Sequence, residues 1–117
     1  MTLKTQISIF LLGAGLAACA TSAHPQSLEG PAAAIRAAEE VGAAGIPAAA
    51  LRLQLAKEQL ERAKPMTSEA EQPGAERLLL RSQADAELAL AIARSTAANA
   101  NAQKASDKNQ TIQSAVR

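Results

Sequence analysis

Few residues of this 117-residue sequence are of a type that performs chemistry at neutral pH. The only cysteine is Cys19, and the only histidine is His24. A thiol nucleophile needs a neighbouring base. A lone histidine in a polar segment, with no base or second ligand beside it, is more often solvated than catalytic. Neither residue has an evident catalytic partner, so the role of Cys19 must be inferred from the residues around it in the sequence.

The carboxylates are a second source of chemistry, because two of them can act as a paired acid and base. The candidates on predicted helices are Glu39, Glu40, Glu58, Glu61, Asp85 and Glu87. Lysines and arginines lie beside them, which favours solvated, ion-paired helix faces. The sequence contains no zinc-ligand spacing, phosphate-binding loop or nucleophile elbow. We therefore expect no catalytic residue, no metal site, no cofactor and no small-molecule substrate, and hence no enzyme.

The segment that precedes Cys19 is typical of a secretory signal peptide. Lys4 supplies the positive start, and residues 7–16 form an apolar run that is shorter than the roughly 20 residues needed to span a bilayer. A buried N-terminal helix is the alternative. Two glycines and the polar, proline-containing sequence that follows argue against it, so residues 1–18 are predicted to be removed.

The residues at the end of this segment, Leu16, Ala17, Ala18 and Cys19, resemble the lipobox of bacterial lipoproteins. The resemblance implies that diacylglycerol is attached to the Cys19 thiol and that the new amine takes a further acyl chain. Ordinary cleavage with a spare thiol and a buried structural cysteine are the alternatives. Ala20 follows where an aspartate would retain the protein in the inner membrane, so the resemblance implies a lipid anchor in the outer membrane, with the chain facing the periplasm.

The charge balance indicates that the lipid, and not basic residues, would hold the chain at the membrane. The sequence has 12 basic and 11 acidic residues, and removal of Lys4 makes the two numbers equal. The single aromatic residue, Phe10, also leaves with the signal peptide. A nucleic-acid partner is not expected, because both a basic footprint and stacking aromatics are missing.

Composition predicts an all-α fold, since alanine is abundant and is the strongest helix former. We expect a short first helix, then an antiparallel hairpin of two helices. Pro31 opens the first helix, and Gly42 and Gly45 end it. The second helix starts at Ile46-Pro47 and runs through Lys64, where Pro65 stops it. The third runs from about Gly74 to Ala98. The expected organisation is a signal peptide (1–18), a lipidated cysteine with a flexible tether (19–30), a helical domain (31–98) and a polar tail (99–117).

The tail is expected to fray or to be disordered, because Asn, Gln, Ser and Lys dominate it. A competing interpretation extends the third helix through Ala102 and Ala105, since alanine persists.

The apolar spacing predicts which helix faces are buried. The second helix has one stripe at 4-3-4-3 spacing, made of Ala49, Leu53, Ala56, Leu60 and Ala63. The third has a stripe made of Leu79, Ala86, Leu90, Ala93 and Ala97, with Leu80, Ala84, Leu88, Ala91 and Ile92 spread over its other side. Two apolar sides predict burial from two directions, either by the first helix or by a second molecule.

The stretch from Ala32 to Ala98 resembles a family of uncharacterised bacterial envelope proteins, domain-of-unknown-function family 4398. The resemblance is carried by short alanine-rich motifs: Ala37-Ala38 with Gly42-Ala43, Pro47 with Leu51, Leu60-Glu61-Arg62-Ala63-Lys64, and Ala75-Glu76-Arg77-Leu78 with Ala84-Asp85-Ala86-Glu87. It implies a helical fold and an envelope location but no activity. The chain departs from the family at Ile46 and Gln72-Pro73-Gly74, where members often have an aromatic residue.

These observations favour a membrane-anchored lipoprotein of the bacterial envelope with a small periplasmic helical domain. Its expected partner, beyond the membrane, is an envelope protein or a second copy of itself. The alternative is an alanine-zipper coiled-coil lipoprotein that links the outer membrane to the cell wall. The breaks at Gly42, Gly45, Pro47, Pro65 and Pro73 count against a single continuous zipper. Nothing in the sequence argues for the third hypothesis, an accessory or inhibitor subunit of an enzyme.

Overall fold

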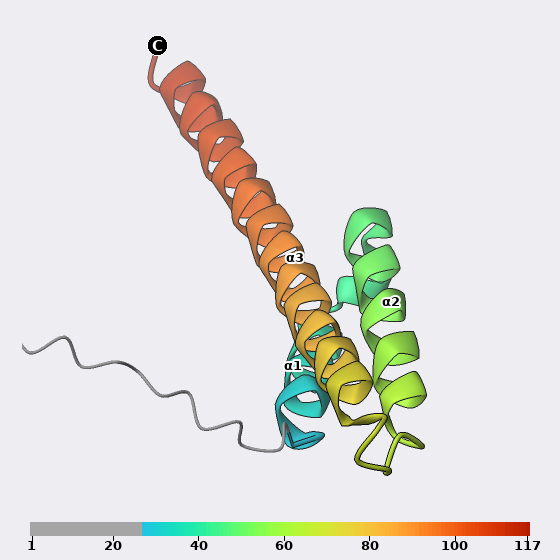
Figure 1. Ribbon diagram of the computed structural model, residues 1–117. Helices are drawn as coiled ribbons and strands as arrows, with labels where there is room; N and C mark the ends of the chain where they lie inside the picture. The colour runs from blue at the N-terminus through green and yellow to red at the C-terminus, as the bar shows by residue number, and fades with distance from the viewer. Residues whose placement is uncertain (1–26) are drawn as a thin grey trace, which may run out of the picture.

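The structure is a computed structural model, which describes residues 27–117 (Figure 1). Three α-helices, α1 (Glu29–Glu40), α2 (Pro47–Ala63) and α3 (Gln72–Ala115), are joined by a 3-10 turn η1 (Ala43–Gly45) and a loop. This part of the chain contains no strand, so the all-α prediction is confirmed. The predicted signal peptide and most of the tether, residues 1–26, lie outside the described residues.

The turn between α1 and α2 depends on one glycine. Gly42 has φ of 77°, in the left-handed region that side chains disfavour, and its N–H donates to the Glu39 carbonyl at 2.9 Å. Ile46 is extended, as the residue before a proline prefers, and Pro47 then opens α2. The predicted breaks between the first two helices are therefore confirmed.

A short loop after α2 reverses the chain, so that α2 and α3 pack antiparallel. Pro65 follows the end of α2, and Pro73 lies in the first turn of α3. Between them, the Ser68 hydroxyl donates to Glu71 Oε2 at 2.6 Å, and the Ser68 N–H donates to the same oxygen at 3.3 Å. These two hydrogen bonds, the hydroxyl's first, hold the pKa of the Glu71 carboxyl below its ordinary value.

The core lies between α2 and α3, and α1 covers one side of it. α2 buries the five residues of the stripe predicted for the second helix: Ala49, Leu53, Ala56, Leu60 and Ala63. α3 buries Ala75, Leu79, Ser82, Ala86, Ala89 and Ala93, and α1 adds Pro31, Ile35 and Ala38. Most of these side chains are alanines, so the helices approach closely and the core has little bulk.

Helix α3 corrects the prediction for the C-terminal part of the chain. The sequence predicts a helix ending near Ala98 and a frayed or disordered tail over residues 99–117, but α3 continues to Ala115. No glycine or proline follows Gly74 to stop it. A side-chain pair also supports the polar turns, because Gln103 Nε2 donates to Asp107 Oδ1 at 3.0 Å.

Every residue from Arg94 to Arg117 is exposed, so this half of α3 extends beyond the three-helix body (Figure 1). We call residues 94–115 the arm. Two residues of the predicted stripe are therefore not buried. Ala97, on the arm, is exposed, and Leu90, in the last turn before the arm, is half-buried. The body ends at Ala93, because α1 and α2 reach no further along α3.

Candidate functional site

The residues with the most specific predicted chemistry lie outside the described part of the chain. They are Leu16, Ala17, Ala18, Cys19 and Ala20, together with His24. The structure therefore leaves the lipidation site and the sorting position as predictions. What it describes is the body that follows them, and the polar contacts and exposed faces of that body.

The candidate carboxylates are dispersed along the helices and do not gather into an acid–base pair. Glu39 on α1 forms an ion pair with Lys57 on α2, and Glu61 pairs with Lys64. Glu58 and Glu87 each accept a hydrogen bond at 2.9 Å, from Gln54 and Gln83 respectively, at i, i+4 spacing. The prediction of solvated, ion-paired helix faces is therefore confirmed for Glu39 and Glu61, whereas Glu58 and Glu87 are exposed but hydrogen-bonded to glutamines.

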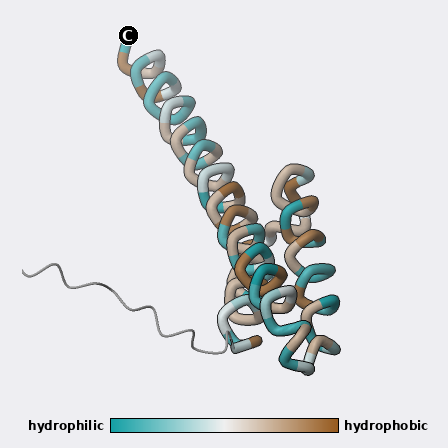
Figure 2. Tube along the Cα trace, in the orientation of Figure 1, coloured by the Kyte–Doolittle hydropathy of each residue, from teal (hydrophilic) through white to brown (hydrophobic). Residues whose placement is uncertain are grey.

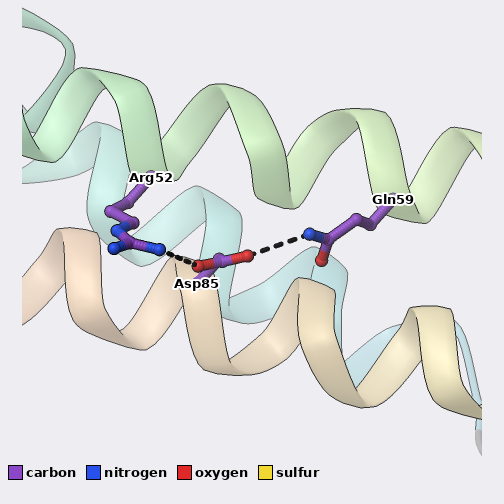
Figure 3. A network of polar contacts seen from close by, with 3 residues as sticks. All are labelled: Arg52, Gln59 and Asp85. Atoms are coloured by element: carbon purple, nitrogen blue, oxygen red, sulfur yellow. Dashed lines mark hydrogen bonds and ion pairs between the residues drawn. The ribbon is translucent and has the colours of Figure 1, made fainter.

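Asp85 is the exception, because it lies between two helices and is largely covered (Figure 3). Its Oδ1 accepts from Arg52 Nη1 at 3.1 Å, and its Oδ2 accepts from Gln59 Nε2 at 2.9 Å. The carboxylate is 16% exposed and the Arg52 side chain 44%. Since both oxygens have donors from α2, the group fixes the position of α2 on α3.

Ser82 makes a second polar contact across the same interface, which the sequence reasoning missed. Its hydroxyl is buried and donates to the Ala56 carbonyl at 2.7 Å. An apolar pattern does not predict burial of Ser82, because its side chain is polar. The signal was its position, three residues after Leu79 and four before Ala86, within the predicted stripe.

A shallow hollow lies at the end of the body where the described chain begins. Its volume is about 260 Å³, below the range of about 300–1,000 Å³ that is usual for small-molecule sites. Its walls come from the start of α1 and from both ends of the α2–α3 loop; they include Leu28, Ala63, Lys64, Met66, Gln72 and Glu76.

Hydrophobic residues are concentrated in the part of α3 that lies within the body, and the arm is more hydrophilic (Figure 2). Some of the hydrophobic side chains on α3 stay exposed. The predicted burial of α3 from two directions is confirmed in part, because α1 and α2 both pack on α3. Leu80 and Leu88 nevertheless remain 52% and 42% exposed, and Ala84 and Ala91 are exposed with them. On α2, Leu51 is exposed as well. Among residues 27–117, neither α1 nor α2 covers the side of α3 that carries Leu80, Ala84, Leu88 and Ala91.

Two further findings concern residues 27–117 only. They include no cluster of three or more histidine, cysteine, aspartate or glutamate side chains arranged to bind a metal ion. None of their helices combines the length and the apolar character needed to cross a membrane.

The comparison with protein families identifies the chain. A family described as "Domain of unknown function (DUF4398)" matches residues 27–105, which covers α1, α2 and α3 as far as Ala105. No curated protein and no solved structure matches the chain. The match spans well over half of the sequence, and its helices are those that form the body. The chain therefore belongs to the DUF4398 family.

Proposed function

We propose that this protein is a lipoprotein of the bacterial cell envelope, anchored through Cys19, whose helical body is a structural or binding module on the periplasmic side of the outer membrane. The observation that carries the proposal is the pattern Leu16-Ala17-Ala18-Cys19 directly after a short apolar run. It contains the only cysteine of the chain. No catalytic role is proposed for any residue.

The strength of the proposed anchor depends on how many acyl chains Cys19 carries. Each buried CH₂ contributes about 0.8 kcal/mol, so two or three acyl chains anchor stably where one gives only marginal binding. After residue 18 the basic and acidic residues are equal in number, and no basic cluster is available to help. The lipid would therefore be both necessary and sufficient for attachment.

The arrangement of the helices suits a module held at one end. Leu28 lies nine positions after Cys19, which at about 3.3 Å per residue keeps the start of the body within about 30 Å of the lipid. The start of α1 and the α2–α3 loop lie at the same end of the body, and the C-terminus of α3 lies at the other (Figure 1). An anchored molecule would thus direct its arm away from the membrane.

The proposal is tested by labelling cells that express the protein with a radioactive fatty acid. The wild type is expected to incorporate the label and to fractionate with outer membranes. Cys19→Ser is expected to lose the label and the membrane association. Thr21→Ser, which leaves Leu16 to Ala20 intact, is the matched control and should behave as the wild type. An unlabelled, soluble wild type contradicts the proposal.

A structural role between the outer membrane and the cell wall is the second candidate. The observation that favours it is the uninterrupted 44-residue helix α3, whose length is about 66 Å. Purified cell-wall sacculi should then pellet the wild-type protein in detergent, and a chain ending at Arg94 should stay in the supernatant. If both chains stay in solution, this role is excluded and the module binds another partner.

A further inference from the structure

A second apolar stripe follows α3 along the side that the body leaves uncovered. Its positions alternate four and three residues apart over four heptads. They are Ala84, Leu88, Ala91, Ser95, Ala98, Ala102, Ala105, Asn109 and Ile112, and we call them the arm stripe. A repeat of 3.5 residues sustained over this length is the pattern of a coiled coil.

All nine positions of the arm stripe are exposed. The two large side chains of the stripe are well exposed, Leu88 to 42% and Ile112 to 51%. Val116 lies four residues after Ile112, just beyond the end of the helix, and is 82% exposed. None of the nine is charged. The six charged residues between Ala84 and Ile112, namely Asp85, Glu87, Arg94, Lys104, Asp107 and Lys108, all occupy other faces.

Within residues 27–117, the arm also lacks support from the three-helix body. Its 22 residues make no buried contact, although isolated helices of this size are marginal in water even when they are alanine-rich. The arm contains asparagine, serine and threonine, which are weaker helix formers. A helix with these properties and one uncharged face gains stability when a second helix covers that face.

We propose that a second copy of this chain covers the arm stripe, so that two α3 helices pack in parallel and in register as a two-stranded coiled coil. In this arrangement each layer meets its own copy. Leu88 packs on Leu88, Ile112 on Ile112, and the alanine layers between them allow close approach. Asn109 meets Asn109, and a single asparagine at the first core position of a heptad is a feature that fixes register and a two-stranded state.

The flanking charges favour the parallel arrangement over the antiparallel one. Parallel packing places Arg94 beside Asn99 of the other copy and Lys108 beside Gln113, so no like charges meet. Antiparallel packing that joins Leu88 to Ile112 brings Arg94 against Lys108 twice in each dimer. Parallel packing also leaves the two bodies, and both chain starts, at the same end.

This inference adds a partner to the proposed module but does not depend on the lipid. It is tested in the full chain carrying Cys19→Ser, kept in mild detergent, so that an introduced cysteine is the only thiol. Ala105→Cys lies in the arm stripe, and Ala100→Cys, an exposed alanine on the opposite face of the same helix, is the matched control. Circular dichroism checks that both variants keep their helical content.

Under mild oxidation, Ala105→Cys is expected to form a disulfide-linked dimer at least tenfold faster than Ala100→Cys. Equal rates, or no cross-link from Ala105→Cys, overturn the parallel dimer. Sedimentation equilibrium in the same background gives the second readout. Ala98→Glu should weaken association at least tenfold, whereas Ala100→Glu should leave it unchanged. A monomeric parent chain at tens of micromolar, or equal effects of the two substitutions, overturns self-association.

Discussion

Two polar side chains on α3, Ser82 and Asp85, reach across to α2 from an interface that is otherwise nearly all alanine and leucine. Alanine surfaces pack closely but are smooth, so they specify poorly how far one helix slides along the other. Hydrogen bonds between particular atoms of the two helices do specify this sliding position. We interpret Ser82 and Asp85 as the residues that fix the register of the hairpin.

Replacement of Ser82 by alanine is expected to lower the free energy of unfolding by about 1 kcal/mol, because a buried hydrogen bond to the Ala56 carbonyl is lost. Ser106→Ala, an exposed serine on the arm, is the matched control and should change stability by less than about 0.5 kcal/mol. Urea denaturation measures both. Equal effects would show that the buried hydroxyl does not stabilise the hairpin.

The Ser68–Glu71 contact in the α2–α3 loop predicts a pH effect. Because the hydroxyl and N–H of Ser68 lower the pKa of Glu71 from its ordinary 4.5, the contact stabilises the fold above that pH and is lost as the pH falls through the lower, folded value. Ser68→Ala should raise the pKa of Glu71, as measured by NMR titration. Thr96→Ala, far along α3, should leave it unchanged. An unmoved pKa in Ser68→Ala contradicts the assignment.

At the scale of elements, α2 is the part that sequence reasoning predicted best. Between Leu53 and Ala63, every residue outside the stripe except Leu55 is charged or polar, and α2 buries the stripe face. Proline and glycine likewise marked the boundaries of α2 and the start of α3. These signals are local, so the sequence carries them in full.

The misses concern α3 and have physical reasons. Its end was placed near Ala98 because the next residues are polar, yet local side-chain pairs and the lack of a breaker let the helix continue. Ala97 was expected in the core, but the other helices end before they reach it. Ser82 and Ala89 were missed as core residues, because which side of an alanine-rich helix is buried depends on its neighbours.

The burial of one α2 face predicts a sharp difference between two leucines on the same helix. Leu53 is 3% exposed and Leu51 is 58% exposed. Leu53→Ala should cost about 2–5 kcal/mol through lost burial and a residual cavity. Leu51→Ala should cost less than about 0.5 kcal/mol, since alanine is also the better helix former. Thermal or urea unfolding compares them, and similar costs would refute the observed orientation of α2.

At the scale of the whole molecule, the chain divides into a compact body and a projecting arm. Residues 94–117 contain four basic residues and one acidic residue, whereas the body has more acidic than basic residues. The family match ends at Ala105, part of the way along the arm. The family match thus includes the body and the first part of the arm, and we assign self-association to a stripe that continues along the whole arm.

A chain ended after Arg94 tests this division. Its body should still unfold cooperatively, because every buried residue lies at or before Ala93. It should also lose the helical signal of half of α3 and sediment as a monomer. The full-length Cys19→Ser chain under the same conditions is the reference. Loss of the cooperative transition would show that the body needs the arm, and retained association would place the interface elsewhere.

The proposed lipid on Cys19 would connect these scales, since it would decide where the body and its arm are held. The most direct measurement is intact-mass spectrometry of the protein isolated from the membranes of a Gram-negative host. We predict a chain that begins at Cys19 and carries diacylglycerol on the thiol and a further fatty acyl group on the amine. A chain that keeps residues 1–18, or that begins elsewhere with an unmodified Cys19 thiol, would contradict the account.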